Sequence, residues 1–468
     1  MLLSFSSYFV KKFKEKFYDF SFFRICYIIS LFFETTSFTN IYALWIKSFI
    51  IFWGFLICLD TLFYDQKKFE IKYKNIIIFF IILNILSCFI NFSSYFLTNL
   101  VFAFHSVVCF FIFFGMNKNT EKKIIFLEMK IFLKFLIFAS GIISALGLLV
   151  MFTKGSFKFF GYTLGIFNNR FLGVYTNSNL AGFVSATSVM ACDLLNDKYF
   201  GNIKESKIKN FLFTIFLFFN IFSLFLTDSN ASFVFITIYL VVRIFCESFA
   251  KYSSFKETKI FREILFISVC VSIIISSSFL IREFSQQTVN WILNKNDKKI
   301  FSIKLIENQD DLEKIHSDKI KIGRENYDVS SGRILLFKQG LILSKIRPLL
   351  GIGRGNLVRY AKIYIDGGLI FSDLHNSYLT IIVANGWIGF IIFMMFAIST
   401  IFRSARMVFS QNHKRKTKFL SKLFSILIAY FCYAIFEKCI LSEITFMVIF
   451  LWIILGYIST VLESEHRS

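Results

Sequence analysis

The chain has 468 residues, of which 56% are hydrophobic, and its mean hydropathy is +0.65. A soluble fold of this length cannot bury so much apolar surface, so the composition excludes an ordinary soluble protein. The net charge of +22 would indicate a nucleic-acid partner only if the basic residues gathered on one soluble face. They lie instead between apolar runs.

Twelve apolar runs, each of about twenty residues, follow one another along the chain and predict transmembrane helices. They are 20–36, 41–63, 75–92, 97–115, 131–152, 180–195, 211–226, 231–249, 263–281, 377–401, 419–436 and 444–461. No small-residue cleavage pattern follows the first run, so we expect it to remain as a span. Most of the nine cysteines fall inside these runs, without a CxxC pair, and are typical of small core hydrophobes; no metal or cofactor is expected.

The connections between the runs alternate in charge. Basic connections, with about four or more Lys and Arg each by the positive-inside count, are the N-terminus, 64–74, 117–130, 196–210, 250–262 and 402–418. The short connections between them, at 34–40, 91–98, 227–230 and 437–443, have almost none. We therefore expect the basic side and both termini in the cytosol, with the Lys and Arg facing anionic lipid heads rather than nucleic acid.

Two connections on the opposite, extracytoplasmic side are longer, and function is expected there. The segment 153–179 is rich in Gly, Asn and aromatic residues, and 282–375 is the only long polar stretch in the chain. The predicted organisation is a transmembrane part over 1–281, an extracytoplasmic loop over 282–376 and a second transmembrane part over 377–468.

An amphipathic helix is predicted within the long loop. Ser330 or Ser331 can cap its start, and apolar residues follow at helical spacing at Ile334, Phe337, Leu341 and Ile346. Pro348 disfavours helical angles at Arg347 and marks its end. We expect this helix to lie on the membrane surface or over the bundle like a lid.

A glycine-rich stretch follows at 351–355. Its backbone can approach a ligand closely because Gly351, Gly353 and Gly355 lack a Cβ. No βαβ unit surrounds it, so a dinucleotide site is not indicated, and a simple tight turn is the alternative. His375 comes next, at the edge of the tenth predicted span. A lone histidine there is often only an interfacial polar residue, but beside Arg-rich and Gly-rich backbone it is placed to act as a base toward an anionic substrate.

Four pieces of the sequence, taken in order, resemble the O-antigen ligase and O-antigen polymerase superfamily of bacterial envelope enzymes. They are NRFLGVYTNSNLA at 169–181, LTDSNA at 226–231, SGR at 331–333 with PLLGIG at 348–353, and HNSYL at 375–379 leading to ANGWIG at 384–389. The resemblance covers roughly 168–396 in ordered motifs. It implies an all-α, GT-C-like bundle of about twelve helices in the bacterial cytoplasmic (inner) membrane, with the long extracytoplasmic loop between the ninth and tenth.

The resemblance also implies a chemistry. Such enzymes move a glycan from an undecaprenyl diphosphate carrier to a hydroxyl of an acceptor glycan, lipid or protein, without a metal. It assigns the diphosphate contact to Arg333, since guanidinium binds phosphate oxygens through paired hydrogen bonds. It assigns to His375 the role of the base that takes the proton of the hydroxyl.

One departure from the family pattern concerns a second phosphate contact. Where the family has Ser-Arg, this chain has Ser229-Asn230. Asn230 can still hydrogen-bond a phosphate oxygen, and further candidates for the missing charge are Arg170, Arg354 and Arg347. Arg170 can equally be an interfacial anchor. Supporting roles are expected for Asn179, Gly351, Gly353 and Asn376, although helix capping alone would account for Asn179.

Two questions stay open at this level. The residues do not separate a polymerase from a ligase, nor do they identify the sugar or the acceptor. The competing class is a lipid-glycan flippase or another polytopic transporter, whose signs are internal repeats, broken helices in paired positions and charges deep within spans. The single proline and the few charges within the runs make that class less favoured.

Overall fold

A computed structural model describes residues 15–39, 42–92, 95–159, 161–197, 207–252, 283–293, 332–409, 414–441 and 443–463, with a few residues between 269 and 281. The longer helices are α2 (Phe20–Glu34), α3 (Ala43–Tyr64), α4 (Lys74–Ile90), α5 (Phe96–Val108), α7 (Lys122–Lys154), α8 (Ser178–Leu195), α9 (Lys207–Leu226), α10 (Asn230–Tyr252), α13 (Arg333–Ser344), α15 (Ser377–Val408), α16 (Lys414–Tyr433) and α17 (Phe446–Glu463). The short ones are η2 (Gln66–Phe69), the π-helix η3 (Cys109–Phe114), α6 (Met116–Asn119), η6 (Arg354–Asn356) and α14 (Leu357–Tyr364).

The helical prediction is confirmed. Eleven of the twelve predicted spans coincide with helices, namely α2, α3, α4, α5 with η3, α7, α8, α9, α10, α15, α16 and α17. The remaining predicted span, 263–281, lies largely outside the described residues. By length and apolarity, seven helices of the described part are able to cross a membrane: α3, α5 with η3, α7, α8, α10, α15 and α17.

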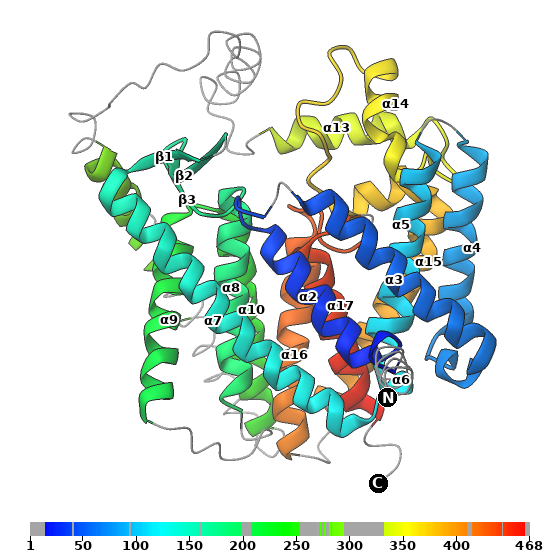
Figure 1. The fold of residues 1–468 in the computed structure, drawn as a ribbon, viewed down its shortest axis with the longest axis horizontal. Helices are drawn as coiled ribbons and strands as arrows, with labels where there is room; N and C mark the ends of the chain where they lie inside the picture. Colours follow the sequence, from blue (N-terminus) through cyan, green and yellow to red (C-terminus); the bar gives the residue numbers. More distant parts are fainter. Residues whose placement is uncertain are drawn as a thin grey trace, which may run out of the picture.

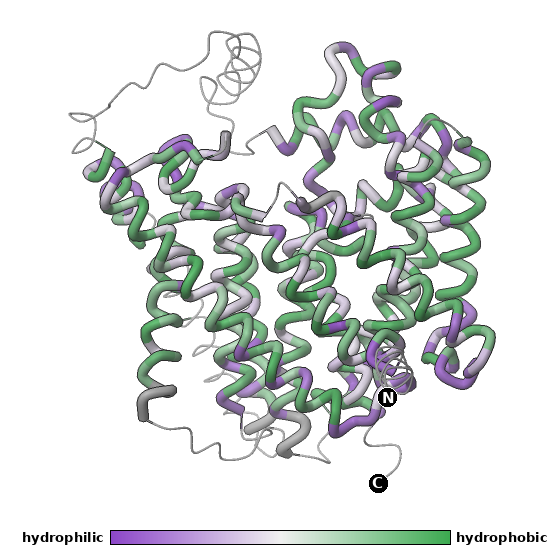
Figure 2. Tube along the Cα trace, in the orientation of Figure 1, coloured by the Kyte–Doolittle hydropathy of each residue, from purple (hydrophilic) through white to green (hydrophobic). Residues whose placement is uncertain are grey.

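The long helices run side by side and carry short elements at one end (Figure 1). Helices α7, α8 and α9 pack together, α10 packs on α16, and α15 packs on α4. The sheet, α13 and α14 lie at the upper end in Figure 1. Hydrophobic residues dominate the middle of the bundle and hydrophilic ones gather toward its two ends (Figure 2), which is the distribution that a bilayer requires.

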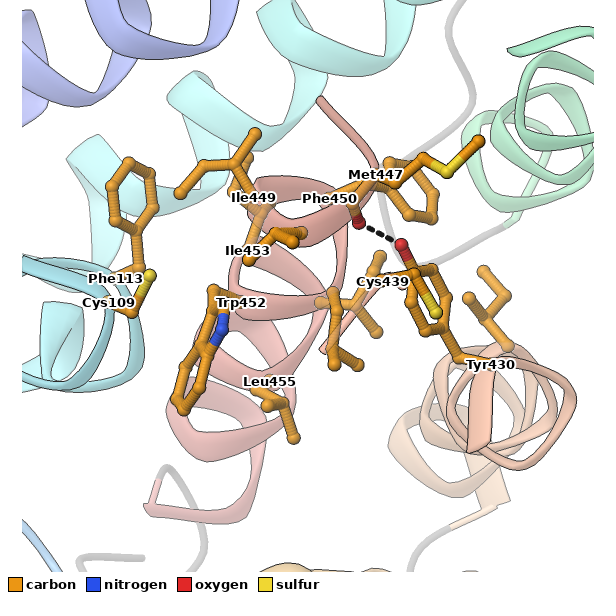
Figure 3. Packing of buried hydrophobic residues seen from close by; sticks show 14 of the residues in the cluster. Cys109, Phe113, Tyr430, Cys439, Met447, Ile449, Phe450, Trp452, Ile453 and Leu455 are labelled. Atoms are coloured by element: carbon orange, nitrogen blue, oxygen red, sulfur yellow. Dashed lines mark hydrogen bonds between the residues drawn. The ribbon is translucent and has the colours of Figure 1, made fainter. Parts of the chain in front are cut away.

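Helix α17 is the centre of the core. Nearly every residue from Phe446 to Leu462 is buried, and its side chains pack against neighbours in several directions (Figure 3). Trp452 lies edge-on to Phe110 with ring centroids 4.6 Å apart, and its indole Nε1 donates to the Ile440 carbonyl at 2.9 Å. A helix that is apolar all round fits a place inside the bundle rather than at its surface.

The connection predicted at 117–130 is mostly helical, since α6 and the first turns of α7 lie in it. Within α7, Glu128 lies inside the protein, where it pairs with Arg24 of α2 at 2.8 Å. Arg24 also donates to the Ile112 carbonyl at 3.3 Å, within the π-helix. A π-turn leaves carbonyls without their usual helical donors, and Arg24 satisfies one of them.

A three-stranded antiparallel sheet occupies 156–173, which corrects the expectation of an all-α fold. Its strands are β1 (Ser156–Phe159), β2 (Tyr162–Phe167) and β3 (Arg170–Gly173), in that order. Asn168 and Asn169 form the β2–β3 turn, both with positive φ of 51° and 55°. Asn tolerates this left-handed conformation, which suits a two-residue hairpin turn. The sheet thereby aims Arg170 back toward the bundle.

Helix α13 is present, but it begins and ends differently from the prediction. Its N-cap is Gly332 in the left-handed conformation, and it ends at Ser344, before Pro348. Ser330 and Ser331 lie outside the described residues. Leu336, Gly340 and Leu343 face the bundle, so the predicted stripe of Ile334, Phe337 and Leu341 remains partly exposed.

A kink in α15 holds the glycine-rich turn. Gly386 has φ 70° and ψ 178° inside α15, a conformation that is essentially restricted to glycine. The freed backbone pairs with the turn: Ile352 N donates to Val383 O at 2.9 Å, and Gly353 N donates to Ala384 O at 3.0 Å. The glycine-rich stretch is thus a tight turn, one of the two interpretations of its sequence, and it docks on the backbone of α15.

Candidate functional site

His375 lies in a tight connection just before α15. Its backbone is left-handed, with φ 44°, which is uncommon for a residue with a side chain and often marks a functional position. The Asp373 carboxylate accepts from His375 N at 2.9 Å, and Asn376 caps α15 by accepting from Leu379 N at 2.9 Å. His375 is therefore fixed directly before the N-terminus of α15.

Ser377 ties this connection to the irregular link between α16 and α17. Its amide donates to Ala434 O at 2.9 Å and its hydroxyl to Glu437 O at 2.7 Å. The same hydroxyl accepts from Cys439 N at 2.7 Å. The backbone of the link is thereby fixed against the start of α15, which brings Glu437 next to His375.

The Glu437 carboxylate joins three of the predicted site residues. It lies 3.2 Å from His375 Nδ1, accepts from the Arg333 guanidinium at 3.3 Å and accepts from Asn179 Nδ2 at 2.9 Å. Its side chain is only 5% exposed. Groups from α8, α13 and the loop before α15 thus meet at one buried charge.

A second chain of charges leads away from His375 on the other side. Asp373 Oδ1 lies 3.4 Å from His375 Nε2, while its Oδ2 pairs with Lys438 at 2.7 Å. Lys438 also pairs with Glu443 at 3.4 Å, and Glu443 pairs with Arg354. Burial alone would raise the pKa of Asp373, but the charges of Lys438 and His375 outweigh it and lower that pKa. Asp373 is therefore an anion at neutral pH.

The imidazole of His375 lies between these two carboxylates. Burial lowers its pKa, yet the hydrogen bond and charge of Glu437, followed by the charge of Asp373, more than compensate, so the pKa of His375 is raised. A neighbouring carboxylate makes an imidazole a stronger base and holds its ring orientation. The His375 imidazole is thus held with a carboxylate near each ring nitrogen.

Two cavities share His375 in their walls. One, of about 370 Å³, lies among α10, α13 and the end of α16 and is mostly apolar. Its lining comprises Asn230, Ala231, Val234, Arg333, Ile334, Phe337, Leu374, His375, Asn376, Ile435 and Phe436. We call it the apolar cavity. None of these lining residues is a carboxylate.

The other cavity, of about 350 Å³, is lined mainly by polar and charged residues and is called the polar cavity. Its lining comprises Glu34, Thr35, Arg170, Thr176, Asn177, Ser178, Asn179, Leu180, Asp373, His375, Glu437, Lys438, Thr445, Phe446 and Met447. The end of α2 closes one wall because Thr176 N donates to Thr35 O at 3.0 Å and Ser37 N donates to Val174 O at 2.9 Å. His375 is the residue that the two linings have in common.

The other predicted site residues lie in one of the two cavities or outside both. Asn230 lines the apolar cavity with Arg333. Arg170 lines the polar one, where it donates to Thr227 O and to Asn179 Oδ1, each at 2.9 Å. Arg347 donates to Ile90 O at 2.9 Å and lines neither cavity.

Gly351, Gly353 and Arg354 support the site from outside it. A Cβ on Gly351 would lie 2.4 Å from Ala384 O, and one on Gly353 would lie 2.8 Å from Asn99 Oδ1. These glycines therefore approach other parts of the protein, and they hold the loop that ends on His375. Arg354 is linked to the site through Glu443 and Lys438.

Glu437, Asp373 and Lys438 do not stand out in the sequence as site residues. Glu437 and Lys438 lie in a short connection with few basic residues. One signal was available, since Glu437 and Glu443 place two carboxylates in a link of a few residues between apolar spans, and ionisable groups so close to lipid usually have a function.

Comparison with protein families adds one finding. Residues 215–394 match the family model described as O-antigen ligase. The matched stretch contains Asn230, Arg333 and His375, whereas Arg170, Asn179 and Glu437 lie outside it. No curated protein matches the chain.

Proposed function

We propose that this chain, a member of the O-antigen ligase/polymerase superfamily, transfers a glycan from an undecaprenyl diphosphate carrier to a hydroxyl of an acceptor in the synthesis of a cell-surface polysaccharide. The acceptor is another glycan, a lipid or a protein, and both polymerase and ligase activities fit. The reaction takes place on the extracytoplasmic face and needs no metal. Within this proposal Arg333 and His375 do the chemistry.

The single observation that carries the proposal is that His375 and Arg333 line one cavity and share one carboxylate partner. The apolar cavity offers a hydrophobic wall for polyprenyl and, at His375, a polar end with Arg333, Asn230 and Asn376. Among the described residues that line it, none is a carboxylate, and the Arg333 guanidinium and the Asn230 amide can donate hydrogen bonds to a diphosphate. A polyprenyl diphosphate, with an anionic head on a hydrocarbon tail, requires such an apolar wall next to a cationic, hydrogen-bonding end.

The chemical step follows from these positions. The acceptor oxygen attacks the sugar carbon that is bonded to the diphosphate, while His375 takes the proton of the attacking hydroxyl. The bond between that carbon and the phosphate oxygen breaks, and its electron pair leaves with the diphosphate. Arg333 stabilises the charge that grows on the leaving oxygen, with Asn230 as a further donor. Of the other predicted cations, Arg170 lines the polar cavity, whereas Arg347 and Arg354 line neither cavity, so Arg333 is the arginine that this proposal places next to the diphosphate.

The placement in the membrane belongs to the same proposal. About twelve spans cross the bacterial cytoplasmic membrane, and the loop 282–376 between spans nine and ten faces outward. The transmembrane parts are 1–281 and 377–468, with both termini in the cytosol. One contact supports this arrangement: α6 packs on η2 and on α17, at the end of the bundle away from α13 (Figure 1). The basic connections 64–74 and 117–130, which contain η2 and α6, therefore lie together.

The test is substitution of the two reacting groups in the source cell. His375→Ala and Arg333→Ala should each abolish long or attached glycan and leave the lipid-linked repeat unit and the protein level unchanged. Arg359→Ala, on the exposed side of α14, is the matched control and should retain glycan. Normal glycan in both site variants would contradict the proposal.

A further inference from the structure

The polar cavity shares His375 with the apolar cavity, and its other lining residues are of a different chemical kind. Glu34, Asp373 and Glu437 supply carboxylates, and Thr35, Thr176, Asn177, Ser178, Asn179 and Thr445 supply hydroxyl and amide groups. Arg170 and Lys438 are its cations. Three carboxylates make this lining unfavourable for a diphosphate, since like charges repel in a partly buried site.

One lining group points to a ligand that donates hydrogen bonds. Glu34 pairs with Lys47 through Oε1 at 2.6 Å, but its buried Oε2 has no hydrogen-bond partner among the residues that the structure describes. A buried polar atom of this kind is usually satisfied, so an unsatisfied one calls for a partner that arrives with a ligand. Sugar hydroxyls both donate and accept, and so match carboxylates, amides and hydroxyls together.

From these observations we infer that the polar cavity binds the acceptor glycan, with its attacking hydroxyl directed at His375 and other hydroxyls bound by Glu34, Asn177 and Ser178. This inference rests on the proposed function and names the place of its second substrate. His375 then stands in the shared wall, with the donor diphosphate on one side and the acceptor hydroxyl on the other. Arg170 acts here as a positioning residue, because it holds the Asn179 side chain that in turn donates to Glu437.

Substitutions confined to one cavity separate the two substrates. Ser178→Phe fills the polar cavity at the first turn of α8 and Glu34→Gln removes the unpartnered carboxylate without changing size, whereas Val234→Phe fills the apolar cavity. The purified full chain in lipid vesicles is given lipid-linked repeat unit from the source cell and oligosaccharides released from that cell's envelope glycans. Binding of undecaprenyl diphosphate is measured separately by native mass spectrometry.

We expect Glu34→Gln to need about tenfold more oligosaccharide for half-maximal transfer, the effect of losing a hydrogen bond to a charged group. Ser178→Phe, which fills the cavity, should need at least as much. Both should bind undecaprenyl diphosphate as the unsubstituted protein does, which also shows that they fold. Val234→Phe should lose that binding. Unchanged oligosaccharide dependence in the two polar-cavity variants, or loss of undecaprenyl diphosphate in them, would overturn the inference. Transfer that survives His375→Ala would instead overturn the proposed function.

Discussion

Glu437 and His375, which are 62 positions apart in the chain, lie with Oε2 and Nδ1 3.2 Å apart at the extracytoplasmic end of the proposed bundle. The same carboxylate contacts Arg333 and Asn179. One buried carboxylate therefore fixes the ring orientation of the His375 imidazole and the direction of the Arg333 guanidinium, although the matched family segment ends before Glu437.

Glu437→Gln tests this role through the pH dependence of transfer. As a base, His375 must be neutral, so the rate falls as the pH drops below its raised pKa. Loss of the Glu437 charge should lower that pKa, move the acid limb of the profile to lower pH and reduce the maximal rate about tenfold or more. An acid limb that keeps its place in Glu437→Gln would show that Glu437 does not act on His375.

The pairing of His375 should also appear in protein stability. Its pKa is raised in the folded protein, so its pairing with Glu437 and Asp373 stabilises the fold fully below the unfolded pKa of about 6.5 and loses effect as the pH rises through the folded pKa. His375→Ala should therefore lower the melting temperature in detergent more at pH 6 than at pH 9. An equal loss at both values would rule out a charged pair.

Arg24 and Glu128 form a fully buried ion pair with side chains 0% and 1% exposed. Arg24→Met should destabilise the protein by about 3–5 kcal/mol because it leaves the Glu128 charge buried without a partner. The double variant Arg24→Met, Glu128→Leu should recover much of that loss. The measurement is thermal unfolding in detergent, and a double variant no more stable than Arg24→Met would contradict this account.

Gly386→Ala should displace the turn that docks on α15. A Cβ there would lie 2.1 Å from Leu349 O, in addition to the strain of φ 70°. Gly367→Ala is the matched control, since its φ is 75° but no atom lies within 4 Å of its Cβ position. The control should lose roughly 1–3 kcal/mol from strain alone, and Gly386→Ala should lose more stability and most transfer activity. Equal effects of the two variants would argue against the steric role of Gly386.

The sequence by itself determined the membrane-type helical architecture and the likeness to the O-antigen ligase superfamily, and through that likeness it singled out Arg333 and His375. Apolar runs and basic links act locally, so each can be predicted without knowing its neighbours. The position of Pro348 and the glycines at 351–355 likewise predicted a turn, because backbone freedom depends on the residue itself.

Only the tertiary structure decided which charges meet. Glu437, Asp373 and Lys438 became site residues because Ser377 ties the α16–α17 link to the start of α15, a contact over 60 positions that no local pattern specifies. The β-sheet at 156–173 was not predicted because its short strands show no clear alternation of apolar and polar residues. Their preference for the strand conformation is weak, and packing against α7 decides it. The pKa of His375 depends on its burial and on its distance from carboxylates of remote segments, and the two cavities form between such segments. Burial and these distances exist only once the chain has folded.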